Sequence, residues 1–329
     1  MRWFLLDRLI EILGTMLAVS FIVYGVLELD SADVAAKALG QFSTDAQRAL
    51  WLHRHGYDDP FLWRYLRWLG HFVTGDWGIS THYKAPVWEI LPERLIRTSI
   101  LATSAMLVMV PLSLSLGILA GVKAGTTVDR VVSLACVATT SIPEFASSVF
   151  LSAIFVFWLH ALPGASTMTG GFSVRELVLP TMVLVLYSSG YIARITRASM
   201  IDVMATPYIR AARMKGASPL RIIFRHALRN ALVAPVTVIM LQIPWLLSGV
   251  IVVEVFFAYP GFGSLLYEAG LNSDIAIIEA CSMMSVITVL ATQLASDLIY
   301  ARLDPRHQFP ARRIRIKRPV ATAAAEPAE

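Results

Sequence analysis

Residues 231–253 read ALVAPVTVIMLQIPWLLSGVIVV, a run of 23 residues without a single Asp, Glu, Lys or Arg. The hydrocarbon core of a bilayer is about 30 Å thick, and an α-helix needs about 20 apolar residues to cross it. The run therefore predicts a transmembrane helix. The chain around it has 329 residues, of which only 16% are charged, and its mean hydropathy is +0.63. This composition excludes a disordered chain and is not that of an ordinary soluble domain.

Five further apolar runs extend the pattern, at residues 12–27, 98–122, 131–159, 177–193 and 280–296. The first run is slightly short for a span, but it lengthens if Glu11 and Glu28 lie near the membrane interface. Arg2 and Arg8 precede it as in a signal peptide, yet no small-residue cleavage site follows, so we interpret it as an uncleaved anchor. We predict an all-α polytopic membrane protein with six transmembrane helices.

The distribution of Lys and Arg predicts the orientation of these spans. The loop at 194–230 carries eight of these residues and the chain beyond residue 296 carries seven, whereas the loop at 254–279 has none and holds four acids. We therefore expect both termini in the cytoplasm.

The predicted organisation has four parts. Residues 1–29 form the N-terminus and the first span, and residues 30–97 form a small helical extracytoplasmic insertion. Residues 98–305 hold the five other spans, with the cytoplasmic loop at 194–230 between two of them. Residues 306–329 are predicted to be a disordered, basic cytoplasmic tail that anionic membrane lipid attracts.

Helix-start and helix-stop residues in the insertion predict two helices. Thr44 and Gln47 have the spacing of a capping box, and Gly56 follows as a stop. Asp59 and Pro60 predict the start of the second helix, with Asp59 as its N-cap. This second helix is apolar over much of its surface. We expect it to lie against the membrane face or the bundle; the alternative is a plain structured loop.

A proline and a carboxylate interrupt the run at 131–159. Pro143, between Ser141 and Glu144, removes one backbone hydrogen bond and predicts a kink. A carboxylate within a span is costly unless it faces water or a partner. Glu144 therefore either lines a transport pathway or lies at the membrane interface. Gln242 is a second candidate, although a buried amide also forms helix–helix hydrogen bonds. These four residues are the candidates for lining a pathway.

The cytoplasmic loop at 194–230 contains one helix-start pattern twice. Thr206-Pro207 and Ser218-Pro219 each place a hydroxyl before a first-turn proline, and Gly216 lies between them, where a helix can end in a left-handed residue. We expect two short helices at an angle, the second with a basic face and an apolar stripe. The basic face comprises Arg221, Arg225 and Arg229, and the stripe comprises Leu220, Ile223, Phe224, Ala227 and Leu228.

Two interpretations fit this loop. An amphipathic helix resting on anionic lipid gains about 1 kcal/mol per basic residue, which accounts for the arginines. It does not account for the small pair Ala211-Ala212 ahead of the break at Gly216, where small residues let another surface approach closely. We therefore favour a docking surface for a cytoplasmic partner.

The loop resembles the signature of the inner-membrane subunits of binding-protein-dependent ABC importers, a Glu-Ala-Ala followed four residues later by Gly. Ala211, Ala212 and Gly216 have this spacing, and Arg210 stands at the glutamate position, as is common in the dipeptide/oligopeptide branch of the family. Other segments resemble that branch in order along nearly the whole chain, at 58–60, 65–70, 75–78, 141–143, 225–231, 257–261 and 297–305. Residues 29–32, LDSA, depart from the Pro-Gly-Asp-Pro usual after the first span.

This resemblance implies a multi-pass permease subunit in the bacterial inner membrane. The permease would pair with a second permease, which is either a homologue or another copy of this chain. Two ATPase subunits would dock beneath, and an extracytoplasmic solute-binding protein would deliver a dipeptide, an oligopeptide, glutathione, a nickel chelate or an opine-like compound. The implied ATPase-coupling residues are Tyr208, Arg210, Ala211, Ala212, Gly216, Ser218 and Pro219.

The sequence contains no GxxxxGK[ST] phosphate loop, so ATP use is expected in the partner subunits. It also has no recognisable Ser-His-Asp, HExxH or paired-cysteine pattern, and Cys136 and Cys281 both lie in apolar runs. We expect no catalytic residue, cofactor, metal or nucleic-acid partner. A secondary transporter for small polar solutes is the alternative, but it would usually show internal repeats and charges at mid-membrane. An intramembrane enzyme would need a buried catalytic set that is not visible.

Overall fold

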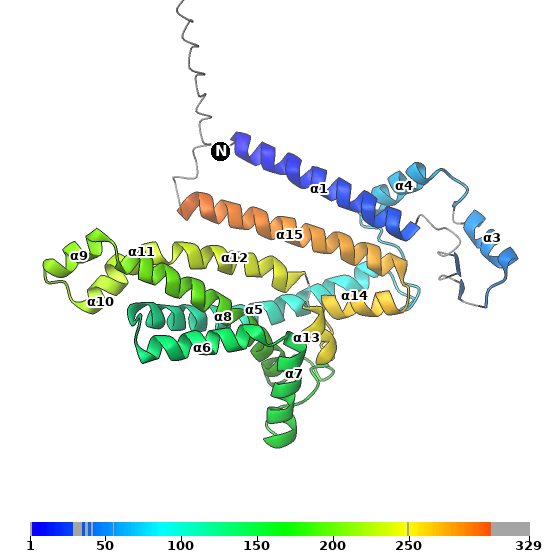
Figure 1. Ribbon diagram of the computed structural model, residues 1–329. Coiled ribbons are helices and arrows are strands. Elements are labelled where there is room, and N and C mark those ends of the chain that lie inside the picture. Colours follow the sequence, from blue (N-terminus) through cyan, green and yellow to red (C-terminus); the bar gives the residue numbers. More distant parts are fainter. Residues whose placement is uncertain are drawn as a thin grey trace, which may run out of the picture.

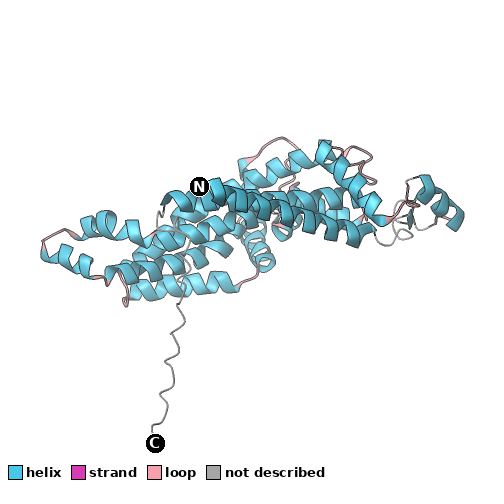
Figure 2. Ribbon diagram, turned by 90° about the horizontal axis from the view of Figure 1, so that it is seen from above, coloured by secondary structure: helices cyan, strands magenta, loops and turns pink. Residues whose placement is uncertain are grey.

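The computed structural model describes residues 2–28, 35–36, 39–40, 42–54, 56–248 and 250–303. Across these ranges the chain is helical, and the β-type pairing there is an isolated bridge between Ile79 and Pro86. Figures 1 and 2 show long helices side by side in an elongated bundle with shorter helices at its ends. The all-α prediction is confirmed. The predicted tail at 306–329 and the segment 29–32 lie outside the described residues.

Four helices are long and apolar enough to cross a membrane without a break. They are α1 (Arg2–Glu28), α5 (Val87–Val122), α8 (Val174–Met204) and α15 (Ile275–Leu303). All four exceed the apolar runs that predict them. In particular, α5 begins well before residue 98, and α8 continues beyond residue 193 into the predicted loop. Residues 194–204 contain neither Gly nor Pro, so α8 ends only where Pro207 approaches.

The run at 131–159 folds as a corner and not as one helix. α6 (Thr127–Ser141) is followed by α7 (Glu144–Ser152) and a π-helical turn, η1 (Ala153–Trp158), and the two arms are bent by 102°. Ile142 is extended, with φ −88° and ψ 123°, because proline disfavours the α conformation in the residue before it. The predicted kink at Pro143 is therefore a sharp turn of direction.

The run at 231–253 is also divided, so the prediction of one continuous helix there is wrong. α12 (Val233–Leu247) is bent by 52° from the helical segment before it, and α13 (Ile251–Phe256) begins separately. Pro244 lies in the last turn of α12 and supplies no backbone donor, which weakens the helix there. The described residues therefore hold four continuous candidate spans, or six if each bent pair counts as one.

Small residues bring α5 and α8 together at the centre of the bundle. A Cβ added to Gly117 would lie 2.4 Å from the Cβ of Thr196, and one added to Gly121 would lie 2.5 Å from the Cβ of Met200. Two glycines four residues apart share one helix face, the arrangement by which membrane helices approach closely. α8 is thus packed tightly against α5 as far as Met200, close to its end at Met204.

The described part of the insertion includes the two helices α3 (Asp45–Arg54) and α4 (Phe61–Thr74). The capping box is confirmed, since Thr44 N donates to Gln47 Oε1 at 2.9 Å and Gln47 N donates to Thr44 Oγ1 at 3.4 Å. Asp59 is not the N-cap of α4, because Pro60 occupies that position without a side-chain hydrogen bond. Asp59 lies one residue too early and pairs with Arg67 instead.

The two polar regions of the chain lie at opposite ends of the bundle. α3 and α4 are at one end of Figure 1, and α9 (Pro207–Met214) and α10 (Pro219–Arg221) are at the other. α1 packs along α15, outside the α5–α8 centre. This arrangement agrees with the predicted separation of insertion and loop, and the assignment of the α9 end to the cytoplasm stays a prediction.

Candidate functional site

The turn between α9 and α10 is built around Gly216. Lys215 N donates to Ala211 O at 3.1 Å, and Ala217 N donates to Ala212 O at 3.2 Å. Gly216 has a φ of +78°, in the left-handed region where a side chain is unfavourable. These bonds form the helix ending for which glycine is preferred. The helix break that the sequence predicts is present.

The segment after this turn differs from the predicted amphipathic α-helix. α10 is three residues long and is followed by a π-helical turn, η2 (Ile222–Ala227), and by α11 (Leu228–Ala231). A π-helical turn rotates the side chains relative to the α-helical period. The predicted apolar stripe is therefore wrong in part, because Leu220 and Phe224 are 68% and 70% exposed whereas Ile222 and Ala227 are buried.

The two hydroxyls predicted to cap the short helices do not do so. Neither Thr206 nor Ser218 makes a side-chain cap bond, and Thr206 Oγ1 donates to Val203 O at 2.6 Å instead. The prolines alone mark both starts, since the fixed φ and the missing N–H of proline suit the first turn.

A small apolar core holds the loop on the end of the bundle. Ile209 of α9 is fully buried together with Met200 of α8 and Ile222 of η2. Ala212 packs against this core and is half-buried, so it faces inward more than toward a partner. The buried side chains make the loop a folded extension of α8 and not a loose strand.

Polar contacts reinforce this attachment. Asn230 Nδ2 donates to Tyr208 OH at 2.8 Å, and Ser199 Oγ donates to Ala231 O at 2.7 Å. The orientation of α9 relative to α8 is thus fixed by bonds on both sides of the Gly216 turn.

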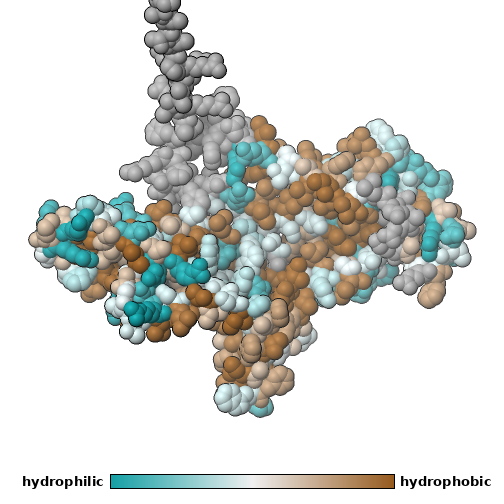
Figure 3. Space-filling model, in the orientation of Figure 1, coloured by the Kyte–Doolittle hydropathy of each residue, from teal (hydrophilic) through white to brown (hydrophobic). Residues whose placement is uncertain are grey.

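An exposed surface, here called the loop tip, lies on the outer side of this loop. Its apolar members Met214, Leu220 and Phe224 are 83%, 68% and 70% exposed. Figure 3 shows hydrophobic and strongly hydrophilic side chains next to one another at the α9 end of the molecule. An apolar centre with a charged rim is typical of a protein interface. The exposed basic members of the loop tip are Arg221, Arg225 and Arg229.

The predicted coupling residues fall within or beside this surface. Most are exposed, and Ala211 is half-buried like its neighbour Ala212. Their role in coupling stays a prediction. The sequence gives prominence to the small pair Ala211-Ala212, whereas the structure also exposes Leu220 and Phe224. The exposed coupling residues are Tyr208, Arg210, Gly216, Ser218 and Pro219.

An ion pair that was not predicted from the sequence joins α6 to α8 close to the loop. Arg197 of α8 donates from Nε and Nη2 to the carboxylate of Asp129 in α6, with Nη2 2.8 Å from Oδ2. Gly125 N donates to the same Oδ2 at 2.9 Å. The available signal was one charged residue just after, and one just before, an apolar run of the sequence. Their pairing depends on how α6 folds back on α8.

The four pathway candidates occupy two separate places. Ser141, Pro143 and Glu144 lie at the corner between α6 and α7, where Ser141 Oγ donates to Val137 O at 2.8 Å. Gln242 is half-buried on α12, which packs chiefly against α5, α8 and α15. Among the described residues no hydrogen bond joins the corner to Gln242. Their role in a pathway stays a prediction.

A second polar cluster lies where α13 meets α14 (Phe262–Leu271). Glu254 is fully buried, and its carboxylate accepts from Thr98 Oγ1 at 2.5 Å and from Ser264 N at 2.9 Å. Thr98 Oγ1 in turn accepts from Phe262 N at 2.7 Å. These four residues, here called the Glu254 clamp, tie the α13–α14 turn to α5.

Two residues of the turn beside the Glu254 clamp, Gly261 and Tyr259, are needed for its close packing. A Cβ on Gly261 would lie 2.2 Å from Glu254 Oε1. Tyr259 OH donates to Arg97 O at 2.6 Å, and burial raises the pKa of Tyr259 to about 12, so this donor keeps its proton. Glu254 is not among the site residues predicted from the sequence, although a carboxylate directly after an uncharged run of 23 residues needs partners.

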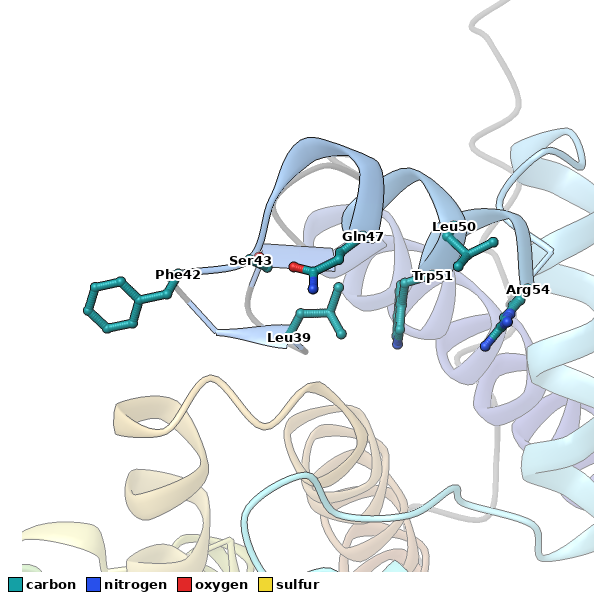
Figure 4. Close-up of a pocket in the computed structure, with 7 residues that line it drawn as sticks. All are labelled: Leu39, Phe42, Ser43, Gln47, Leu50, Trp51 and Arg54. Carbon is teal, nitrogen blue, oxygen red and sulfur yellow. The ribbon is translucent and has the colours of Figure 1, made fainter.

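The insertion carries a shallow surface groove beside α3 (Figure 4). It lies at the end of the molecule opposite to the loop tip, so the two do not form one site. No group of three or more His, Cys, Asp or Glu side chains that could hold a metal occurs in the described part of the chain. The groove is lined by Leu39, Phe42, Ser43, Gln47, Leu50, Trp51 and Arg54.

The bundle, its apolar spans and the folded polar loop define a multi-pass helical membrane protein. Residues 113–308 match the family model described as binding-protein-dependent transport system inner membrane component. The chain belongs to this family and is an inner-membrane permease component of an ABC transporter.

Curated relatives align over nearly the whole chain. The oligopeptide transport system permease protein AppB of Bacillus subtilis is 29% identical over 94% of this chain and 100% of its own length. The glutathione transport system permease protein GsiC of Salmonella typhimurium is 32% identical over 93% of this chain and 99% of its own. The di/tripeptide transport system permease protein DppB of Pseudomonas aeruginosa is 30% identical over 92% and 98%.

A solved structure shows the same fold. A chain of the MetNI methionine ABC transporter in an inward-facing conformation superposes with a TM-score of 0.55 at 20% identity. The match covers 65% of this chain and 96% of that chain. The helical core therefore has the fold of an ABC importer permease.

Proposed function

We propose that this chain forms, with a second permease, the pathway by which an ABC importer moves peptides or peptide-like solutes across the inner membrane. The proposal is supported by relatives that are named oligopeptide, di/tripeptide and glutathione permeases and that align from end to end. The second permease is a homologue or another copy of this chain, and an extracytoplasmic solute-binding protein delivers the substrate.

Two separate ATPase subunits power this transport by docking at the loop tip. The observation that carries this assignment is the exposure of Met214, Leu220 and Phe224 on a loop whose inner side is packed on α8. Large apolar side chains at a folded, solvent-facing tip indicate a protein contact. Met200 of α8 belongs to the apolar core of the loop. A displacement of the loop tip by an ATPase subunit is therefore transmitted to α8.

Reconstitution tests the proposed function. We expect uptake of labelled peptide into proteoliposomes only when this chain is combined with the second permease, the ATPase subunits, the binding protein and ATP. The chain purified alone is expected to hydrolyse no ATP, in keeping with its lack of a phosphate loop. Uptake by this chain alone, driven by a proton or sodium gradient, would contradict the proposal and favour a secondary transporter.

The Gly216 turn provides a first prediction. Gly216→Val forces a β-branched residue into the left-handed region, which costs about 1–2 kcal/mol locally. No atom lies within 4 Å of the added Cβ, so the cost is conformational and tilts α10 relative to α9. We expect normal membrane levels but a parallel loss of peptide uptake and of binding-protein-stimulated ATP hydrolysis.

Gly171→Val is the matched control for Gly216→Val. Gly171 has a φ of +95° and also has no atom within 4 Å of an added Cβ, but it lies in a different turn, between η1 and α8. We expect Gly171→Val to have a similar conformational cost and to leave both peptide uptake and ATP hydrolysis near their unsubstituted levels. Equal behaviour of the two variants would show that the Gly216 turn has no special part in coupling.

A further inference from the structure

α4 is apolar on two adjoining sides. Its inner side carries four aromatic residues that pack inside the molecule, and its outer side carries four apolar residues whose side chains are exposed in the described chain. The inner residues are Phe61, Tyr65, Trp68 and Phe72. The outer residues are Leu62, Trp63, Leu66 and Val73, with exposed fractions of 58%, 66%, 47% and 77%.

The polar residues of α4 are confined to the remaining strip. Arg67 and His71 are four residues apart and therefore share a face, where they pair with Asp59 at 2.5 Å and Asp76 at 3.0 Å. The other cation, Arg64, is turned inward and is nearly buried. A helix with one narrow polar strip and a wide apolar remainder is typical of one that lies in a membrane interface.

The inward arginine fixes the position of α4 on α1. Arg64 Nη1 lies 3.4 Å from Glu28 Oε2 at the end of α1, and its guanidinium lies over the ring of Tyr57, 4.6 Å from the centroid. Tyr57 OH donates to Glu28 Oε1 at 2.8 Å. The charge is thus neutralised within the protein, so it does not prevent the rest of α4 from lying in an apolar medium.

Contacts with α1 place α4 at membrane depth. Tyr65 OH is 2.8 Å from Ser20 Oγ, and the rings of Phe21 and Tyr65 meet edge to face at 5.2 Å. Ser20 lies eight residues before Glu28, the end of the candidate span Arg8–Glu28. At 1.5 Å per residue, the contact is about 12 Å inside the end of that span.

The outer side of α4 continues an exposed apolar surface on α1. α1 has its own exposed apolar residues at this level, including Leu17, Phe21 and Val26 with exposed fractions of 52%, 45% and 75%. Figure 3 shows hydrophobic surface along α1 that continues toward α4. Since α1 is an apolar span of a membrane permease, a neighbour that crosses it at this depth contacts the same acyl chains.

We propose that the outer side of α4 is a lipid-contact surface, immersed among the acyl chains of the leaflet at the insertion end of the bundle, with the Arg67–His71 strip facing the headgroups and water. The insertion is thus anchored in the membrane by α4 as well as by its connection to α1. This assignment is independent of the substrate and of the ATPase contact.

Site-directed spin labelling tests this surface in the complete transporter, reconstituted in phosphatidylethanolamine–phosphatidylglycerol vesicles. Leu66→Cys and Val73→Cys place a label on the outer side, and Arg67→Cys is the matched control on the polar strip. Cys136 and Cys281 are buried, and the unsubstituted chain measures any labelling at them. We expect more frequent collisions with oxygen than with a water-soluble nickel chelate at residues 66 and 73, and the reverse at residue 67.

Two results would overturn the proposal. Nickel-chelate collisions at residues 66 and 73 as frequent as at residue 67 would place the outer side in water. Low collision rates with both reagents at residues 66 and 73 would show that a protein surface, such as that of the second permease or the binding protein, covers this side of α4 instead of lipid.

Discussion

Replacing Leu220 and Phe224 together with serine is expected to weaken the association of the permease with its ATPase subunits at least about a hundredfold. Burying one such side chain contributes about 1.5–3 kcal/mol, and each 1.4 kcal/mol changes an affinity about tenfold. Both side chains are mostly exposed in the chain alone, so their removal does not disturb the bundle. Peptide uptake and ATPase co-purification are expected to fall together.

The conservative pair Leu220→Met with Phe224→Leu is the control for this double variant. It keeps the apolar contact while it changes the shape of both side chains, and we expect most of the association to remain. A single Arg221→Ala change is expected to be milder still, since a surface ion pair contributes about 0–1 kcal/mol. Unchanged ATPase co-purification by the serine variant would place the contact elsewhere.

Gly261→Ala is expected to destabilise the other end of the bundle strongly. The new Cβ would lie 2.2–2.4 Å from the carboxylate of Glu254, which the hydrogen bonds to Thr98 and Ser264 hold in place. Overpacking of this kind costs about 1–3 kcal/mol, and each hydrogen bond released as the carboxylate moves costs about 1 kcal/mol more. The melting temperature of the purified complex measures the loss.

Gly270→Ala, nine residues further along the chain, is expected to have the opposite effect on stability. Gly270 lies in α14 and has no atom within 4 Å of an added Cβ, and alanine in place of a helical glycine stabilises by about 0.5–1 kcal/mol. A melting temperature lowered at residue 261 and raised at residue 270 is therefore expected. Equal shifts in melting temperature for Gly261→Ala and Gly270→Ala would show that the Glu254 clamp is not rigid.

Local patterns in the sequence account for much of this fold. Apolar runs of membrane length predict the helices, and Gly216 and the Thr44–Gln47 pair predict a helix end and a helix start that the structure contains. The sequence does not predict how far each helix extends or bends. Pro143 indicates a kink, but the angle of 102° depends on what the second arm packs against.

The candidate site is predicted less completely, because its details depend on distant residues. The π-helical turn η2 interrupts the predicted α-helix at Ile222–Ala227, and a 3.6-residue period cannot anticipate it. The exposure of Leu220 and Phe224 beside the buried Ile222 depends on how this segment packs on α8. Thr98 and Glu254 are 156 positions apart, so no local pattern reveals their bond. Asp129 and Arg197 likewise meet only once α6 has folded back on α8.

Photo-crosslinking from residue 224 tests the docking role of the loop tip most directly. A benzophenone amino acid replaces Phe224 in the assembled importer in native membranes, and the same probe at Phe157, an exposed residue of η1, serves as the reference. We expect an adduct between this chain and an ATPase subunit from residue 224 and none from residue 157. Adducts from residue 224 with lipid alone would contradict the docking role and leave the loop as an amphipathic segment resting on the membrane.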